Sequence, residues 1–210
     1  MDLYIFGSYC RGEIDNYSDI DLLLIKDINE DLKAFDLDKF SIYNKKRIDE
    51  LWHEGNPFAW HLFLESKFIF SNTKINYLKS LGVPNDYQNL NHDLHKFYQL
   101  YLDAKESLNQ SFSSKDFDFS MIFLAIRNFA SCYSLGYLKK PNFSRNSSLH
   151  LGEDSIKISN LSYSILEKSR ILSTRGIGNN ILDSEFDVVV NEMENITNWF
   201  EKLNKKNQNE

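Results

Sequence analysis

Two aspartates, Asp19 and Asp21, follow a glycine–serine pair, Gly7-Ser8, within one short segment of the chain. Carboxylate oxygens suit Mg²⁺, which is commonly held by one or two carboxylates together with substrate phosphates. A glycine lets a bound group approach the backbone closely, and a serine hydroxyl with exposed amides can hold phosphate oxygens. The pattern therefore predicts that a triphosphate lies on the Gly7-Ser8 turn and a metal ion lies against the aspartates.

Two predicted strands position this segment. Apolar and β-branched residues fill 3–6 and 20–25, with turn-forming Gly, Ser, Asn and Asp between them. Side chains alternate along a strand, so a strand beginning at Asp19 would present Asp19 and Asp21 on one face and turn Ile20 into the core. We therefore expect two oxygen ligands side by side at the start of the second strand.

Residues 3–70 resemble the nucleotidyltransferases of the DNA polymerase beta superfamily, whose motif is Gly-Ser, a spacer and Asp-x-Asp. The residues that match this motif, or suit its minimal members, are Gly7, Ser8, Arg11, Gly12, Ser18, Asp19 and Asp21. The resemblance implies transfer of a nucleoside monophosphate from a nucleoside triphosphate, with ATP expected, to an acceptor, with release of pyrophosphate. It also implies two Mg²⁺ ions.

The resemblance assigns roles to individual residues. Asp19 and Asp21 are the expected catalytic metal ligands, and nucleotide binding falls to Gly7, Ser8, Arg11 and Ser18. The family supplies a third carboxylate from a later strand. Our candidate is Asp38, which precedes a predicted strand at 39–43, with Asp36 facing the same way. The alternative interpretation is that both are solvated loop acids. The sequence identifies no general base.

The remaining pattern predicts an α+β fold. Helices are expected over 46–52 and 58–65, followed by an edge strand over 67–70. Later apolar residues recur at three, four and seven positions, which predicts helices near 90–108, 117–137, 159–172 and 184–202. We expect a small mixed β-sheet nucleotidyltransferase domain at residues 1–84 and a helical bundle domain at residues 85–210.

Three further residues stand out. His61 lies in an aromatic predicted helix, where we interpret it as a hydrogen-bonded core histidine, with a role in the site as the alternative. Lys140 and Arg145 lie in a basic loop, and we expect them to bind nucleotide because arginine suits bidentate phosphate contact. The alternative for this loop is an ordinary solvated connection between helices.

Composition and charge narrow the classes of partner. The net charge is −6 and no long basic run occurs, which argues against bulk nucleic-acid binding. Two cysteines cannot build a disulfide framework, and no apolar stretch approaches the length of a membrane span. We expect a cytoplasmic protein that binds a nucleoside triphosphate and an unidentified acceptor, with a protein partner or a homodimer as further candidates.

Three functions remain open from the sequence. One is modification of a small molecule, for which the acidic surface suits a cationic acceptor. Another is an antitoxin-like protein adenylyltransferase acting on a partner toxin, as in toxin–antitoxin pairs. The third is a nucleotide-binding module whose catalysis has been lost. Extension of a polymer or a tRNA ranks lower because no broad basic surface is indicated.

Overall fold

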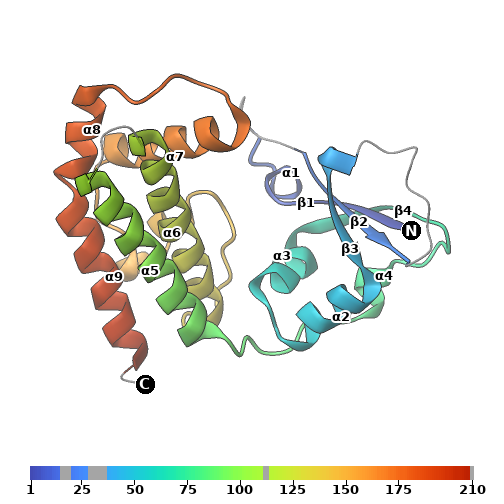
Figure 1. The fold of residues 1–210 in the computed structure, drawn as a ribbon. Helices are drawn as coiled ribbons and strands as arrows, with labels where there is room; N and C mark the ends of the chain where they lie inside the picture. Colours follow the sequence, from blue (N-terminus) through green and yellow to red (C-terminus); the bar gives the residue numbers. More distant parts are fainter. Residues whose placement is uncertain (15–19, 28–36, 111–113, 209–210) are drawn as a thin grey trace. The chain divides into compact units, whose positions relative to one another are not determined.

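The computed structural model describes residues 1–14, 20–27, 37–110 and 114–208 (Figure 1). The chain divides into two compact units, Met1–Asn89 and Leu90–Glu210. The first unit contains a small mixed sheet, and the second is built from helices. The predicted α+β fold class is confirmed.

The sheet of the first unit has four strands in the order β3-β2-β1-β4. Their bounds are β1 Asp2–Phe6, β2 Asp21–Lys26, β3 Phe40–Asn44 and β4 Ser66–Ser71. β1 runs antiparallel to β2 and β4, and β2 runs parallel to β3. Phe6 pairs with Asp21 and Leu22 pairs with Phe40, so the last residue of β1 lies beside the first residues of β2 and close to the start of β3. We call this the Gly7 end of the sheet.

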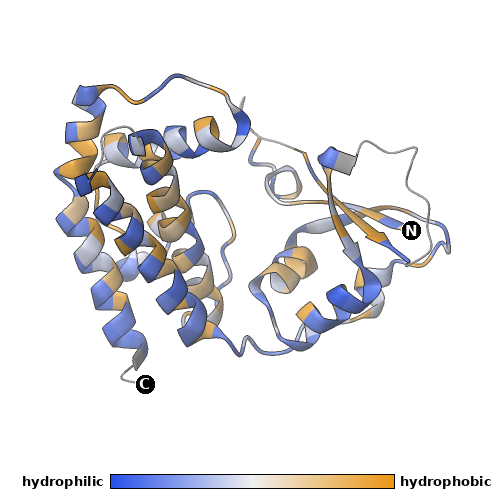
Figure 2. Ribbon diagram, in the orientation of Figure 1, coloured by the Kyte–Doolittle hydropathy of each residue, from blue (hydrophilic) through white to orange (hydrophobic). Residues whose placement is uncertain are grey.

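Helices α2 (Lys45–His53), α3 (Pro57–Glu65) and α4 (Tyr77–Ser80) complete the core of this unit. Asn44 caps α2 by accepting from the N–H of Arg47, and Asn56 caps α3, which has a proline in its first turn. Alternate strand residues enter the core, and Figure 2 shows that β1 and β2 are hydrophobic. The buried core cluster is Tyr4, Phe6, Leu23, Ile25, Ile48, Leu51, Trp52, Ala59, Leu62 and Leu78.

The second unit is organised around α6 (Lys115–Gly136), which is buried along most of its length. α5 (Leu90–Gln110) and α7 (Asn160–Arg175) pack against it. α8 (Asp183–Val190) follows α7, and the short helices η3 (Ser147–Leu149) and η4 (Gly152–Asp154) lie in the α6–α7 connection. The last helix, α9 (Met193–Gln208), is held by the indole N–H of Trp199, which donates to the Asp154 carbonyl at 2.8 Å.

One predicted helix was wrong. The apolar pattern over 184–202 indicated a single helix, but the structure forms α8 and α9 with a turn at Asn191 and Glu192. The Glu192 carboxylate accepts from the N–H of Ser159, the capping residue of α7, at 3.1 Å. This contact joins residues that are far apart in sequence, and no glycine or proline marks the break. None of the described helices is apolar over a length that could cross a membrane.

Candidate active site

The turn at Gly7 joins β1 to α1 (Ser8–Arg11), a short helix that the sequence analysis did not predict. Gly7 has φ 75° and ψ −141°, a combination that strains any residue with a Cβ. Its carbonyl accepts from the N–H groups of Cys10 at 3.0 Å and Arg11 at 3.3 Å, and its own N–H donates to the Glu65 carbonyl at 3.2 Å. Backbone hydrogen bonds therefore hold the turn on both sides.

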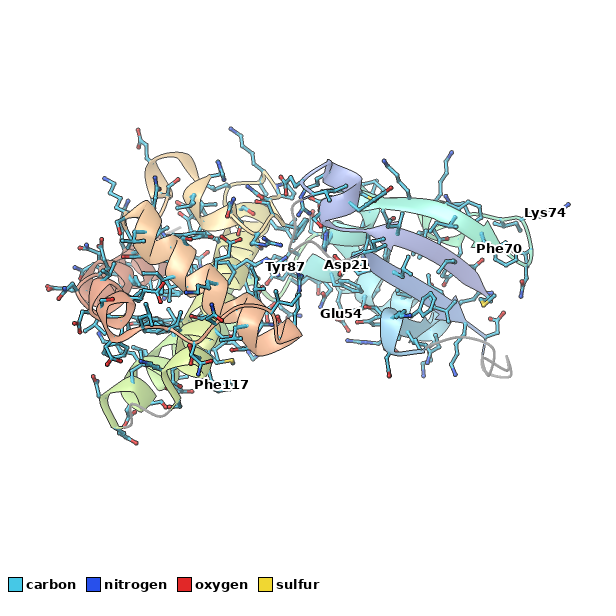
Figure 3. The ribbon with its side chains drawn as sticks, turned by 90° about the horizontal axis from the view of Figure 1, so that it is seen from above. Asp21, Glu54, Phe70, Lys74, Tyr87 and Phe117 are labelled. Carbon is cyan, nitrogen blue, oxygen red and sulfur yellow. The ribbon has the colours of Figure 1, made fainter. Side chains whose placement is uncertain are left out.

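The carboxylate of Asp21 lies against Gly7. Asp21 is the first residue of β2 and pairs with Phe6, the residue before Gly7. A Cβ added to Gly7 would come within 2.6 Å of Asp21 Oδ2, so this oxygen occupies the space that a side chain at position 7 would need. Asp21 is exposed and lies at the opposite end of the sheet from Phe70 (Figure 3). A solvent-accessible carboxylate thus directly adjoins the glycine turn.

The expectation for Ile20 was wrong. We expected Ile20 to point into the core between Asp19 and Asp21, but its side chain is 59% exposed. Strand pairing begins at Asp21, opposite the last residue of β1, so Ile20 precedes the paired strand and no alternation rule applies to it. Asp19 and Ser18 lie outside the described residues, and their predicted roles stay predictions.

Asp38 is brought to the same end of the sheet by the parallel pairing of β2 and β3. It lies on the short helix η1 (Leu37–Lys39), directly before β3, and it is exposed. Because Leu22 pairs with Phe40, β2 and β3 both begin at the Gly7 end of the sheet. Asp21 is the first residue of β2, and Asp38 lies shortly before the first residue of β3. Asp38 as third carboxylate stays a prediction, and its neighbour Asp36 lies outside the described residues.

A metal ion at the Gly7 end of the sheet would need oxygen ligands in addition to those of Asp21. Asp21 offers exposed carboxylate oxygens beside the turn, which is the ligand chemistry that Mg²⁺ requires. Within 1–14, 20–27, 37–110 and 114–208, no three His, Cys, Asp or Glu side chains group closely enough to hold an ion. A complete ligand set therefore needs Asp19 or an oxygen from the substrate. One carboxylate with substrate phosphates suffices for Mg²⁺.

Residues 1–81 match the nucleotidyltransferase domain family. The first unit is a nucleotidyltransferase domain. This family transfers a nucleoside monophosphate, and the match covers Gly7, Asp21 and Asp38. The helical unit follows the matched segment, as in polymerase beta-like nucleotidyltransferases with a C-terminal helical domain. A comparison with the curated proteins gave no match.

The nucleotidyltransferase domain contains an ion-pair network that joins α1, which follows the glycine turn, to the end of α3. Arg11, at the end of α1, contacts Glu65 through Nη1 and Glu13 through Nε, the latter at 2.7 Å. His61, one turn before Glu65 on α3, places Nε2 3.0 Å from the same carboxylate and packs edge-on against Phe6, with ring centroids 5.5 Å apart. The side chains of Glu65 and His61 are 14% and 13% exposed, so the network is largely shielded from water.

Charge neutralisation in this network shifts two pKa values. Burial would raise the pKa of Glu65, but the hydrogen bond from His61 and the charge of Arg11 outweigh it and lower that pKa. Burial would likewise lower the pKa of Arg11, but its contacts with Glu13 and Glu65 raise it. Both groups are therefore held in their charged forms. The contact between His61 and Glu65 is at ion-pair distance, and the interpretation of His61 as a hydrogen-bonded core histidine stays a prediction.

The network fixes the position of α1 relative to the end of α3. The same residue, Glu65, accepts the Gly7 N–H on its carbonyl and the Arg11 guanidinium on its carboxylate. The sequence analysis missed Glu65 because its partners lie 54 and 58 positions earlier in the chain, too far for a local pattern to show. Arg11 was predicted to bind nucleotide, but its guanidinium contacts two carboxylates, and nucleotide binding through it stays a prediction.

Cys10 lies on the same short helix but is not an activated thiol. Its Sγ donates to the Ile5 carbonyl at 3.3 Å, and burial raises the pKa of the thiol. A thiol with a raised pKa stays protonated at neutral pH and is a poor nucleophile. Cys10 therefore joins α1 to β1 through this contact rather than having a chemical role.

The predicted nucleotide ligands of the helical unit lie in its α6–α7 connection. Lys140 is exposed, and its backbone N–H donates to the Ser134 carbonyl at 2.9 Å. Arg145 pairs with Glu167 at 2.9 Å, and both side chains are 25% exposed. These residues belong to the second unit, which the structure describes separately from the first. Nucleotide binding by Lys140 and Arg145 stays a prediction.

Proposed function

We propose that this chain transfers a nucleoside monophosphate from ATP, in a Mg²⁺-dependent reaction, to a small-molecule or protein acceptor. The proposal rests on one observation, that Asp21 Oδ2 lies within 2.6 Å of where a Cβ at Gly7 would be. A triphosphate bound on the Gly7-Ser8 turn would have its phosphates beside an exposed carboxylate. A carboxylate repels phosphate unless a cation lies between them, so the arrangement favours a metal-dependent site.

The residues at the Gly7 end of the sheet would bind and orient the triphosphate. Gly7 leaves room for the phosphates near the backbone, and the Ser8 hydroxyl is available at the start of α1. Asp21, together with Asp19 and Asp38, would hold the metal. When bound, the metal polarises the α-phosphate and offsets the charge that develops there.

The transfer itself exchanges one phosphorus bond for another. An acceptor oxygen or nitrogen forms a bond to the α-phosphorus, the bond to the bridging oxygen breaks, and pyrophosphate leaves. The acceptor also loses a proton, which no described residue is assigned to remove. The network of Arg11, Glu65 and His61 contributes by holding the turn in the position that in-line attack requires.

A labelling experiment tests the proposal. The full chain is incubated with nucleoside triphosphates labelled at the α-phosphate, with Mg²⁺ or with EDTA, and with or without a cell lysate. We expect label to pass from ATP to an acceptor only with Mg²⁺. Label on a small molecule or on a protein identifies the acceptor class, and label on a toxin encoded beside this chain would identify the antitoxin-like function.

Two results would contradict the proposal. Mg²⁺-dependent ATP binding with no label transferred to any acceptor would indicate a nucleotide-binding module that has lost catalysis. Transfer that proceeds equally in EDTA would show that the carboxylates serve another purpose than holding a metal.

A further inference from the structure

A cavity of about 470 Å³ lies in the second unit, between residues of α5, α8 and α9 (Figure 1). This volume is within the range of roughly 300–1,000 Å³ that small-molecule sites occupy. In the described part of the chain, the cavity is lined by Lys105, Leu108, Asn109, Gln110, Phe186, Val190 and Met193. Asn109, Gln110 and Val190 are exposed, so the cavity is open to solvent at these residues.

The apolar wall of the cavity belongs to the packed core of the unit. Leu108, Phe186 and Met193 are each only 7% exposed. The ring of Phe186 stacks on that of Phe119 on α6, with centroids 5.5 Å apart and planes 13° from parallel. Side chains held by such packing keep their positions when a ligand enters. The wall therefore offers a preformed surface to an apolar group.

Lys105 supplies the one cation among the described lining residues. Its side chain is half-buried, and its Nζ donates to the Thr197 hydroxyl on α9 at 2.9 Å. The same Nζ lies 5.9 Å from the centroid of the Tyr101 ring. The hydroxyl of the fully buried Tyr101 lies 2.6 Å from that of Thr197, so the partner of the ammonium group is itself fixed. An ammonium group has three N–H donors, which leaves two for a ligand.

The nearby carboxylates of α5 and α9 do not neutralise Lys105. Glu106 accepts from the Gln110 amide at 3.1 Å, and Glu201 lies 4.0 Å from Lys205 on its own helix. Among the residues that the structure describes, Lys105 contacts a hydroxyl and an aromatic ring but forms no ion pair. Its positive charge is therefore available to an anion that enters the cavity.

We propose that this cavity binds a small organic carboxylate with an apolar body. The carboxylate pairs with Lys105, and the apolar body lies against Leu108, Phe186 and Met193. A single ammonium group matches the single charge of a carboxylate, whereas a phosphate ester carries about −1.5 to −2 and would need further cations. The site lies within the second unit and does not depend on the proposed transfer at Gly7.

Isothermal titration calorimetry of the full chain with sodium octanoate tests this site, without nucleotide or metal. We expect saturable binding by the wild type that becomes about tenfold weaker or more in Lys105→Gln, because a charge-assisted hydrogen bond is lost. The matched control is Lys96→Gln, which removes an exposed lysine of the same helix that also lies over an aromatic ring. This control should bind octanoate as the wild type does.

A second variant and a second probe test the apolar part of the site. Val190→Trp replaces an exposed lining residue, so the fold should be kept while the larger side chain fills the cavity and weakens octanoate binding. 1-Octanol has the same apolar body without the charge, and it should bind the wild type about tenfold more weakly than octanoate. Circular dichroism confirms that each variant is folded.

Four results would overturn the proposal. They are absence of saturable octanoate binding, equal binding by folded Lys105→Gln, equal binding by folded Val190→Trp, and binding of 1-octanol as tightly as octanoate. An equal loss in Lys96→Gln and Lys105→Gln would also overturn it, because the effect would then follow the net charge rather than the cavity.

Discussion

Arg11 and Arg170 are both half-buried arginines, but only Arg11 is neutralised. Glu65 and Glu13 contact Arg11 behind the glycine turn, whereas Arg170 meets the Ser120 hydroxyl and the charge of Arg175. The pKa of Arg11 is accordingly raised, and that of Arg170 is lowered. A guanidinium that is paired with carboxylates of the protein holds structure in place, whereas Arg170 leaves most of its N–H donors to water.

The same difference separates the surroundings of the two arginines. At the Gly7 end of the sheet, the exposed charges include the carboxylates of Asp21 and Asp38, and the guanidinium of Arg11 is paired with Glu65. Around Arg170 on α7, the acids are paired elsewhere, and no carboxylate of the described residues pairs with Arg170.

Replacing Gly7 should have the largest effect among the variants that test this contrast. In Gly7→Ala, the new Cβ would meet Asp21 Oδ2 at 2.6 Å and would occupy a backbone conformation with φ 75°. The flexible carboxylate would move away, so we expect the rate of transfer to fall by about 100-fold, with a loss of about 1–3 kcal/mol in the free energy of unfolding. Labelled-nucleotide transfer and urea unfolding measure the two effects.

Gly82→Ala is the matched control for this variant. Gly82 has φ 72°, but a Cβ there would meet nothing within 4 Å. The Gly82→Ala variant should lose stability because of backbone strain, with little change in the rate of nucleotide transfer. If Gly7→Ala and Gly82→Ala lose the same small amount of activity, the contact between Asp21 and the turn has no part in catalysis.

Glu65→Gln should lower the stability of the fold, whereas Arg170→Gln should not. Glu65→Gln removes the carboxylate shared by Arg11 and His61, and we expect it to lower the free energy of unfolding by about 1–3 kcal/mol. Arg170→Gln removes a half-buried charge with no carboxylate partner among the described residues, and we expect no loss, or a gain of about 1 kcal/mol. Urea unfolding measures both, and equal destabilisation by the two variants would remove the contrast.

The smallest expected effect is a pH dependence carried by Glu65. Its pKa in the folded chain is lower than the ordinary value of 4.5, so its ionised form stabilises the fold above that pH. This stabilisation is lost as the pH falls through the lowered pKa. The difference in unfolding free energy between the wild type and Glu65→Gln should therefore be full at pH 7 and shrink below pH 4.5. A constant difference down to pH 3 would show that Glu65 does not titrate as a paired carboxylate.

Much of the first unit could be predicted from sequence because its signals are local. Strand alternation and the turn-forming residues around Gly7 located β1 and β2 to within a residue or two. The capping asparagines and Pro57 similarly mark the starts of α2 and α3. Ile20 was assigned wrongly because the start of β2 is set by where β1 ends, and a period-two pattern does not contain that information.

The contacts that distinguish the two arginines could not be predicted in this way. Glu65 and Arg11 are separated by 54 positions, and Arg170 and Ser120 by 50. A sequence shows that an arginine is present, but only the fold shows whether a carboxylate reaches it. The break between α8 and α9 was missed for a similar reason, because the Glu192 carboxylate turns to Ser159 on another helix.

The central claim is that a carboxylate beside the glycine turn serves nucleotide transfer, and a pair of variants at the two ends of β2 tests it most directly. Asp21 begins β2 and Asp27 directly follows its last residue; both are exposed, and Asp27 pairs with Lys45 at 3.0 Å. Each is changed to asparagine, and the rate of labelled-nucleotide transfer is measured with Mg²⁺. We expect Asp21→Asn to lower the rate by about 100-fold or more and Asp27→Asn to leave it unchanged. A folded Asp21→Asn variant that transfers nucleotide as fast as Asp27→Asn would contradict the claim.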